Sequence, residues 1–226
     1  METGAESSLD RFEGRRDAGS RLAHRLIALK IADPVVVALP RGGVPVAEEI
    51  ARAFGAPLEI LGVRKLGSPA NPEYGIGAIA EDGTRVVDPE AAAVLGISNG
   101  ELDAVAARER AEIERQLRTY RGRRRPLDLQ GRTVLIVDDG AATGLTDLAA
   151  VHAIRRRKPG WIVLALPVCS PSALELLRGE ADQVLCLRAP VGFRGVSGSY
   201  SDFSQVSDRE VIDALRRTAV PASRAA

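Results

Sequence analysis

The stretch from Val134 to Thr146 constrains the fold more than any other part of the chain. It reads Val-Leu-Ile-Val-Asp-Asp-Gly-Ala-Ala-Thr-Gly-Leu-Thr. Its four leading apolar residues, rich in β-branched types, predict a strand that is buried on both faces of a parallel sheet. Asp138 and Asp139 follow at the carboxyl end of this strand. Because adjacent carboxylates repel each other and are costly to bury, we expect them where polar partners or a cation can reach them.

The loop after the two aspartates has the composition of a phosphate-binding loop. Its residues are small or carry hydroxyls, up to the start of a helix-like run: Gly140, Ala141, Ala142, Thr143, Gly144, Leu145 and Thr146. Small residues let the backbone approach a ligand closely, and unpaired amides at a helix N-terminus favour a phosphate. The pattern is neither a P-loop nor a dinucleotide fingerprint. It also differs from receiver domains, in which an Asp-Asp pair lies near the start of the domain, because this pair lies after more than half of the chain.

All thirteen positions of this stretch resemble the ribose-phosphate signature of the type I phosphoribosyltransferases. In that family four apolar residues and two acidic residues precede a loop that ends in Thr-Gly-x-Thr. The alternative is a buried strand followed by an ordinary solvated Asp-Gly turn. The resemblance implies transfer of a 5-phosphoribosyl group from phosphoribosyl pyrophosphate to an acceptor, expected to be a nucleobase, with release of pyrophosphate. It also implies Mg²⁺, held mainly by the substrate, because a hard cation neutralises the leaving group.

The resemblance also assigns expected roles to individual residues. Asp138 and Asp139 would hold the ribose hydroxyls and stabilise positive charge at the anomeric carbon, while the loop from Gly140 to Thr146 would bind the 5-phosphate. A second strand, glycine turn and helix follow one another from Val35 to Phe54. The pyrophosphate-binding residues would come from this turn and from the end of the next strand: Arg41, Gly42, Gly43 and Lys65. A plain tight turn is the alternative for the Arg-Gly-Gly sequence.

Two further segments carry expectations about the substrate. Leu58 to Val63 predicts a strand, and the prolines and glycines from Ser68 to Gly77 predict a mobile loop. The resemblance implies that this loop closes over the substrate. Near the C-terminus, three aromatic residues interleaved with glycines and serines could stack on a flat base: Phe193, Tyr200 and Phe203. The alternative for each ring is that it closes the edge of the core.

Composition and periodicity predict an α/β fold. Strand and helix patterns alternate from Val35 to Leu187, which predicts a doubly wound, mostly parallel sheet with ligands at the carboxyl ends of its strands. Apolar residues make up 45% of the 226 residues, enough for a full core. We expect one domain, 1–226, with a core at about 17–190, a helical insertion at about 89–125 and a C-terminal hood and helix at about 191–217. Cys169 and Cys186 show no metal spacing and are interpreted as buried free thiols.

Charge and hydropathy limit the partners. The formal net charge of +1 gives no reason to expect nucleic acid, and no apolar run is long enough to span a bilayer. We therefore expect a cytoplasmic protein without a membrane partner, and the resemblance suggests a homodimer. The basic segment Arg121–Arg125 is interpreted as cations at a helix C-terminus, with pyrophosphate or RNA binding as the alternative.

Two other functions stay open at this stage. The chain could bind phosphoribosyl pyrophosphate or a nucleotide as a non-catalytic regulator, because members of the resembled family include such proteins. It could also be an acid-pair phosphohydrolase or kinase-like protein that uses an aspartate as nucleophile.

Overall fold

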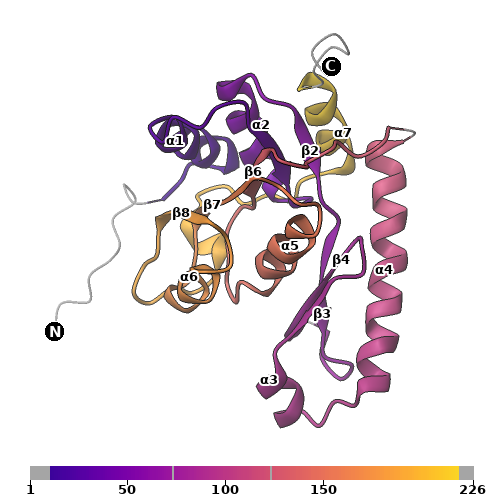
Figure 1. The fold of residues 1–226 in the computed structure, drawn as a ribbon. Coiled ribbons are helices and arrows are strands. Elements are labelled where there is room, and N and C mark those ends of the chain that lie inside the picture. The colour runs from indigo at the N-terminus through magenta and orange to yellow at the C-terminus, as the bar shows by residue number, and fades with distance from the viewer. Residues whose placement is uncertain (1–10, 73, 123, 219–226) are drawn as a thin grey trace, which may run out of the picture.

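A five-stranded parallel sheet forms the centre of the protein (Figure 1). The computed structural model describes residues 11–72, 74–122 and 124–218. The strands lie in the order β2-β1-β6-β7-β8, and every neighbouring pair is parallel. Their bounds are β1 (Val35–Ala38), β2 (Leu58–Ile60), β6 (Thr133–Val137), β7 (Trp161–Val168) and β8 (Gln183–Arg188). The predicted fold class, a doubly wound and mostly parallel sheet, is confirmed.

The central strands are apolar along their whole length because helices cover both faces of the sheet. Successive residues point to opposite faces, so Val35 and Val37 join one core cluster while Val36 and Ala38 join the other. All four side chains of β1 are at most 1% exposed. The strand predicted from Val134 to Val137 is buried in the same way, as β6.

The helices divide between the two faces. On one face lie α1 (Arg15–Ile27), α2 (Gly43–Phe54) and α7 (Asp208–Arg217). On the other face lie α5 (Leu145–Arg155) and α6 (Pro171–Leu177), packed on the strands through Ala149, Ile154 and Leu177. A short 3₁₀ helix, η2 (Val196–Ser199), lies between β8 and α7.

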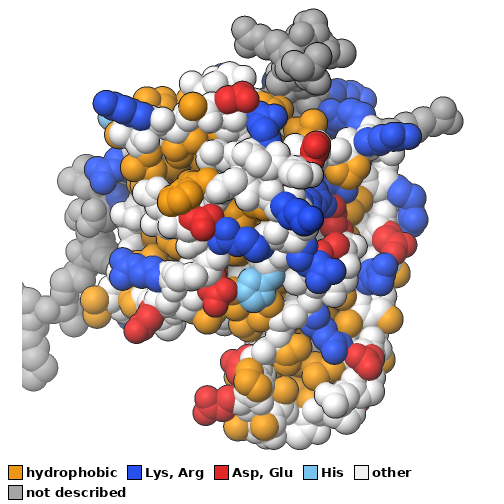
Figure 2. All heavy atoms as spheres, viewed as in Figure 1, with side chains coloured by type: hydrophobic (Ala, Val, Ile, Leu, Met, Phe, Trp, Pro, Cys, Tyr) orange, Lys and Arg blue, Asp and Glu red, His pale blue; other side chains and the backbone are white. Residues whose placement is uncertain are grey.

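A lower lobe extends from this body (Figure 1). It comprises the antiparallel strands β3 (Val63–Gly67), β4 (Gly75–Ala80) and β5 (Arg85–Val87), with α3 (Pro89–Val94) and α4 (Asn99–Arg121). The strands and α4 bury a small core of their own, which includes Leu66, Ile76 and Ile113. Figure 2 shows apolar side chains gathered on this lobe, where Val94 is 80% exposed.

The lobe corrects part of the sequence prediction. The strand expected from Leu58 to Val63 is two strands, because β2 ends at Ile60 and β3 begins a different sheet at Val63. The mobile loop expected up to Gly77 is also shorter, since Gly75 already belongs to β4. A Cβ at Gly77 would meet the carbonyl oxygen of Val86, so this glycine serves close strand packing.

Arg121, at the end of α4, is an internal ion-pair residue. Its guanidinium lies 3.1 Å from both Glu59 and Glu81 and donates to the carbonyl of Ile60, with 11% of the side chain exposed. These contacts join α4 to β2 and to the turn after β4. Arg121, the first arginine of the basic segment, therefore has a structural role. Arg123 of the same segment lies outside the described residues.

Cys169, directly after β7, lies beside Cys186 of β8. Both are free thiols, and their Sγ atoms are 2.7 Å apart. Cys169 is buried as expected, whereas Cys186 is only partly buried. Within the described ranges, no helix is long and apolar enough to cross a membrane.

Glu48 holds the three helices on one face of the sheet together. Its side chain, 0% exposed, bonds Arg16 of α1, Arg52 of α2 and Arg217 of α7 at 2.9, 3.0 and 2.6 Å. Burial alone would raise its pKa, but the guanidiniums of Arg217 and Arg16 outweigh burial and lower the pKa.

Gly19 allows the close approach of α1 and α2. A Cβ there would lie 2.6 Å from the carbonyl oxygen of Val46. We expect Gly19→Ala to lower the free energy of unfolding by about 1–3 kcal/mol, because the helices would have to separate. Urea unfolding followed by circular dichroism measures this change. Gly100→Ala, a helical position with open space around it, is the matched control, and equal losses in both variants would contradict the packing argument.

Candidate functional site

Two loops meet where the order of the strands reverses. β1 lies between β2 and β6, so the chain leaves β1 and β6 toward opposite sides of the sheet, and a crevice forms at their carboxyl ends. Leu39 N–H donates to the carbonyl of Val137 at 2.9 Å across this point. The loop that contains Arg41, Gly42 and Gly43 and the loop that contains Asp138 and Asp139 both lie here. The sequence predicted these two loops separately.

The glycines of the first loop lie directly against the two aspartates. A Cβ at Gly42 would overlap Oδ2 of Asp139, and a Cβ at Gly43 would lie 2.6 Å from the carbonyl oxygen of Val137 and 3.1 Å from Oδ1 of Asp138. Only glycine fits this spacing. The peptide bond between Pro40 and Arg41 is cis.

Burial and mutual repulsion act on the two carboxylates. Burial raises the pKa of Asp138 well above its usual value, and the charges of Asp139 and Asp147 add to this effect. The backbone N–H of Asp139 donates to Oδ1 of Asp138 at 2.8 Å. Burial also raises the pKa of Asp139, although Arg15 opposes the shift. A ligand that carries positive charge or several hydroxyl groups would therefore stabilise the ionised form of both aspartates.

Arg15, which the sequence analysis did not select, binds Asp139 directly. Its Nε lies 2.8 Å from Oδ2 of Asp139, and both side chains are largely buried. The same guanidinium donates to the carbonyl of Ser204 at 2.7 Å and lies 3.8 Å from the ring centroid of Phe203. The helix dipole disfavours an arginine in the first turn of a helix. The position of Arg15 therefore indicated, from sequence alone, that it has a specific partner.

The aromatic residues expected to stack on a base lie beside the acid pair. Tyr200 is 3% exposed, donates to the carbonyl of Asp139 at 2.6 Å and packs against Phe12 and Phe203. Burial, with the nearby charge of Asp139, raises the pKa of Tyr200. Phe203 carries Arg15 on its face, and Phe193 is half-buried against the same cluster. Base stacking stays a prediction for these rings, each of which contacts the protein's own side chains here.

The second loop is shaped for a ligand. Gly140 and Gly144 have positive φ values of 153° and 78°, and Gly144 caps α5. Ala141 is fixed to the end of β7 by bonds with Val168 and Ser170, whereas Ala142 and Thr143 are exposed. The backbone N–H groups of residues 142–146 donate to no other group in the described parts of the chain. The bend therefore has unpaired backbone amides at a helix N-terminus, which is an arrangement that favours binding of an anion.

Arg41 lies beside α7, and Lys65 lies on the lobe. Arg41 is one-third exposed and lies 3.5 Å from Asp208, which also accepts a 2.6 Å bond from Tyr120. Lys65 is exposed on β3, where its side chain runs along Gly75. The pyrophosphate role of both residues stays a prediction.

Comparison with known proteins identifies the family. The model of the phosphoribosyl transferase domain matches residues 7–197. The chain belongs to this family. It is 42% identical over 206 residues to a protein named "Putative phosphoribosyl transferase" in two strains of Mycobacterium tuberculosis. That match covers 91% of this chain and 46% of the relatives, so the chain spans about half the length of the curated relatives it matches.

Solved structures agree on the fold. The crystal structure of TT1426 from Thermus thermophilus is 40% identical, with a TM-score of 0.78, and covers 93% of this chain and 100% of that chain. The AQ2163 protein of Aquifex aeolicus is 13% identical with a TM-score of 0.50, covers 77% of this chain and 74% of that chain, and supports the fold alone.

Asp147 is a buried acid that the sequence analysis also missed. It lies in the first turn of α5, is 2% exposed, and its Oδ1 has no hydrogen-bond partner among the described residues. Burial, with a smaller contribution from the charge of Asp139, raises the pKa of Asp147 to about 7. The folded protein therefore keeps a proton here that an unfolded chain loses near pH 4.

This difference predicts how stability depends on pH. Between about pH 4 and pH 7 the folded state binds the additional proton, so stability falls as pH rises through this window, by up to about 4 kcal/mol for three pKa units. We expect Asp147→Asn to flatten this part of the curve and to be more stable than the parent at pH 8. Urea unfolding at several pH values tests this. Asp103→Asn, at a site that is 68% exposed, is the control, and an unchanged slope in Asp147→Asn would contradict the assignment.

Proposed function

We propose that the protein transfers the 5-phosphoribosyl group from phosphoribosyl pyrophosphate to an acceptor, most simply a nucleobase, with release of pyrophosphate. The observation that carries the proposal is the meeting of two loops at the switch point: the Gly42-Gly43 turn lies against Asp138 and Asp139, beside a bend with open amides. Membership of the phosphoribosyl transferase family supports the same reading.

Each part of this site suits one part of the donor. The open amides of residues 142–146, at the N-terminus of α5, suit the 5-phosphate. Asp138 and Asp139 suit the ribose hydroxyls, and their negative charge would stabilise the positive charge that develops at the anomeric carbon. The Gly42-Gly43 backbone with Arg41, and Lys65 after a movement of the lobe, would stabilise the departing pyrophosphate.

Magnesium would arrive with the donor. The described residues contain no group of three or more His, Cys, Asp or Glu side chains that could hold a metal ion. The acid pair alone can supply at most part of an octahedral oxygen shell, so the pyrophosphate and ribose oxygens would complete it. The residues present therefore fit a magnesium complex of the substrate better than a resident ion.

A non-catalytic regulator that binds the donor or a nucleotide is the second candidate. The observation that favours it is the Arg15–Asp139 pair, because Oδ2 of this aspartate is already occupied by a guanidinium. Catalysis would require the ribose to use the other acid oxygens or to displace Arg15. Release of pyrophosphate separates the two candidates, since a regulator binds the donor without consuming it.

Substitution of the first acid tests the proposed chemistry. We expect the protein to release pyrophosphate from magnesium phosphoribosyl pyrophosphate with at least one base of a purine and pyrimidine panel. Asp138→Asn should lower kcat by about 100-fold or more, because it removes charge that faces the anomeric carbon. Asp103→Asn, an exposed acid on α4, should leave the rate unchanged. Donor binding by calorimetry without any turnover would instead establish the regulator, and absence of both would refute both candidates.

The close contact at Gly42 gives a second test. Gly42→Ala places a methyl group on Oδ2 of Asp139, so the loop and the acid pair must move apart. We expect kcat/KM to fall by about tenfold to a hundredfold, because the reacting groups are misplaced. Steady-state pyrophosphate release measures the effect. Gly198→Ala, where a Cβ would meet nothing within 4 Å, is the control. A Gly42→Ala protein with parental kinetics would show that this spacing is not needed.

A further inference from the structure

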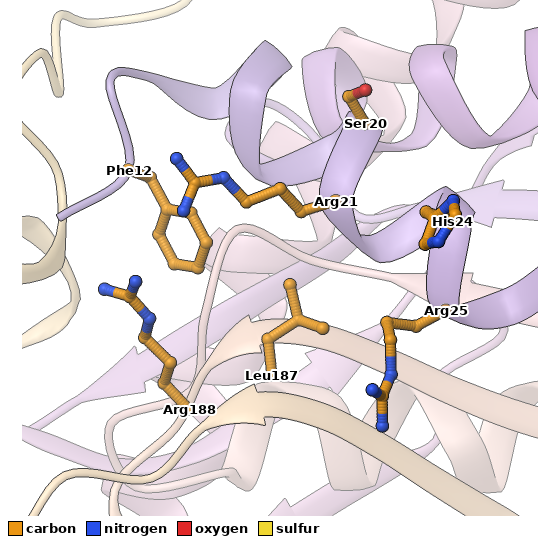
Figure 3. A pocket seen from close by; sticks show the side chains of 7 residues that line it. All are labelled: Phe12, Ser20, Arg21, His24, Arg25, Leu187 and Arg188. Carbon is orange, nitrogen blue, oxygen red and sulfur yellow. The ribbon is translucent and has the colours of Figure 1, made fainter. Parts of the chain in front are cut away.

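A second cavity lies away from the two loops, between α1 and β8 (Figure 3). Its volume is about 510 Å³, within the range of small-molecule sites. It is lined by Ser20, Arg21, His24 and Arg25 of α1, by Leu187 and Arg188 of β8, and by Phe12, which precedes α1. None of these residues belongs to the acid pair or to either phosphate loop.

The lining is strongly basic, although the chain as a whole is nearly neutral. The formal net charge of the protein is +1, yet this one cavity has three arginines and a histidine in its wall and no acidic residue. Arg21 is paired with Asp17 at 2.9 Å. Arg25 and His24 are exposed and have no ion-pair partner in the described residues. Positive charge gathered in a concave surface attracts an anion.

The shape of the lining indicates more than an inorganic ion. Leu187 lies between the arginines in Figure 3 and gives the cavity an apolar floor. Arg188 and Arg21 lie 4.7 and 5.4 Å from the ring centroid of the buried Phe12, which holds their planar guanidiniums in place. A guanidinium plane can bind phosphate oxygens through its edge and a flat ring through its face. A phosphate attached to a ring system would use both features.

We propose that this cavity is a binding site for a nucleoside monophosphate, separate from the proposed donor site. The phosphate lies between Arg21 and Arg188, whose guanidiniums both lie beside Phe12, and the base lies over Leu187 toward Arg25. Arginine binds phosphate oxygens in bidentate fashion, so two such residues account for specificity toward a phosphorylated ligand over a nucleoside.

The position of the cavity connects it to the acid pair by two short routes. Phe12 packs on Tyr200, and Tyr200 donates to the carbonyl of Asp139. Helix α1 carries Arg21 and Arg25 and also Arg15, which binds the carboxylate of Asp139. We expect a nucleotide bound to Arg21 and Arg25 to shift α1 and, with it, the Arg15–Asp139 contact, so that the cavity would regulate whatever binds at the acid pair.

Calorimetry with AMP and GMP tests the binding, with adenosine and guanosine as unphosphorylated controls. The double variant Arg21→Gln/Arg25→Gln should weaken nucleotide binding about tenfold or more, since a charge-assisted contact to the phosphate and a guanidinium contact to the base are lost. Arg118→Gln, an exposed arginine on α4, should bind like the parent. No nucleotide binding to the parent, or undiminished binding to the double variant, would overturn the proposal. Circular dichroism of the variants confirms that they are folded.

A second measurement locates the ligand without substitutions. AMP or GMP should protect Arg21 and Arg25 from modification by phenylglyoxal, as measured by peptide mass spectrometry. Protection confined to Arg41 would place the nucleotide at the donor site and overturn the proposal.

The regulatory part rests on the proposed function: AMP or GMP should shift the affinity for phosphoribosyl pyrophosphate in the parent but not in the double variant. An unshifted affinity in the parent would overturn regulation while leaving the binding site intact. Failure of pyrophosphate release would leave the AMP and GMP titrations unaffected, so the two proposals fail separately.

Discussion

The repulsion between Asp138 and Asp139 is the constraint around which the rest of the site is arranged. Two carboxylates at the end of a buried strand are costly, and the protein offsets this cost with contacts from distant parts of the chain. Arg15 reaches Oδ2 of Asp139 from the start of α1, and Tyr200 binds its backbone carbonyl. The start of α1 and the segment around Tyr200 are thus both held at the acid pair by their contacts with Asp139.

Local patterns predicted the sheet well. The strand at Val134–Val137 and the strand, turn and helix from Val35 to Phe54 follow from apolar periodicity and the positions of glycines, which act within a few residues. The loops at Gly42 and Gly140 were also recognisable, because glycines between a strand and a helix are required by the backbone itself. These features are determined by nearest neighbours along the chain, so one sequence is sufficient to find them.

Contacts between distant residues could not be predicted in this way. Nothing near Arg15 in the sequence indicates that it meets an aspartate 124 positions later, and nothing near Asp147 indicates that its carboxyl loses contact with water. The split between β2 and β3 has the same origin, because continuous apolar residues do not show which of two sheets they join. Such features depend on how the elements pack, and packing appears only in three dimensions.

The buried Glu48 has a consequence for how the chain is connected. Arg16 lies in the first turn of α1 and Arg217 is the last residue of α7, and both bind this one carboxylate, so the start of α1 and the end of α7 lie near each other. A short linker could join them, and new ends could be opened at an exposed turn elsewhere without breaking the sheet. The fold therefore suits circular permutation through this pair of helix ends.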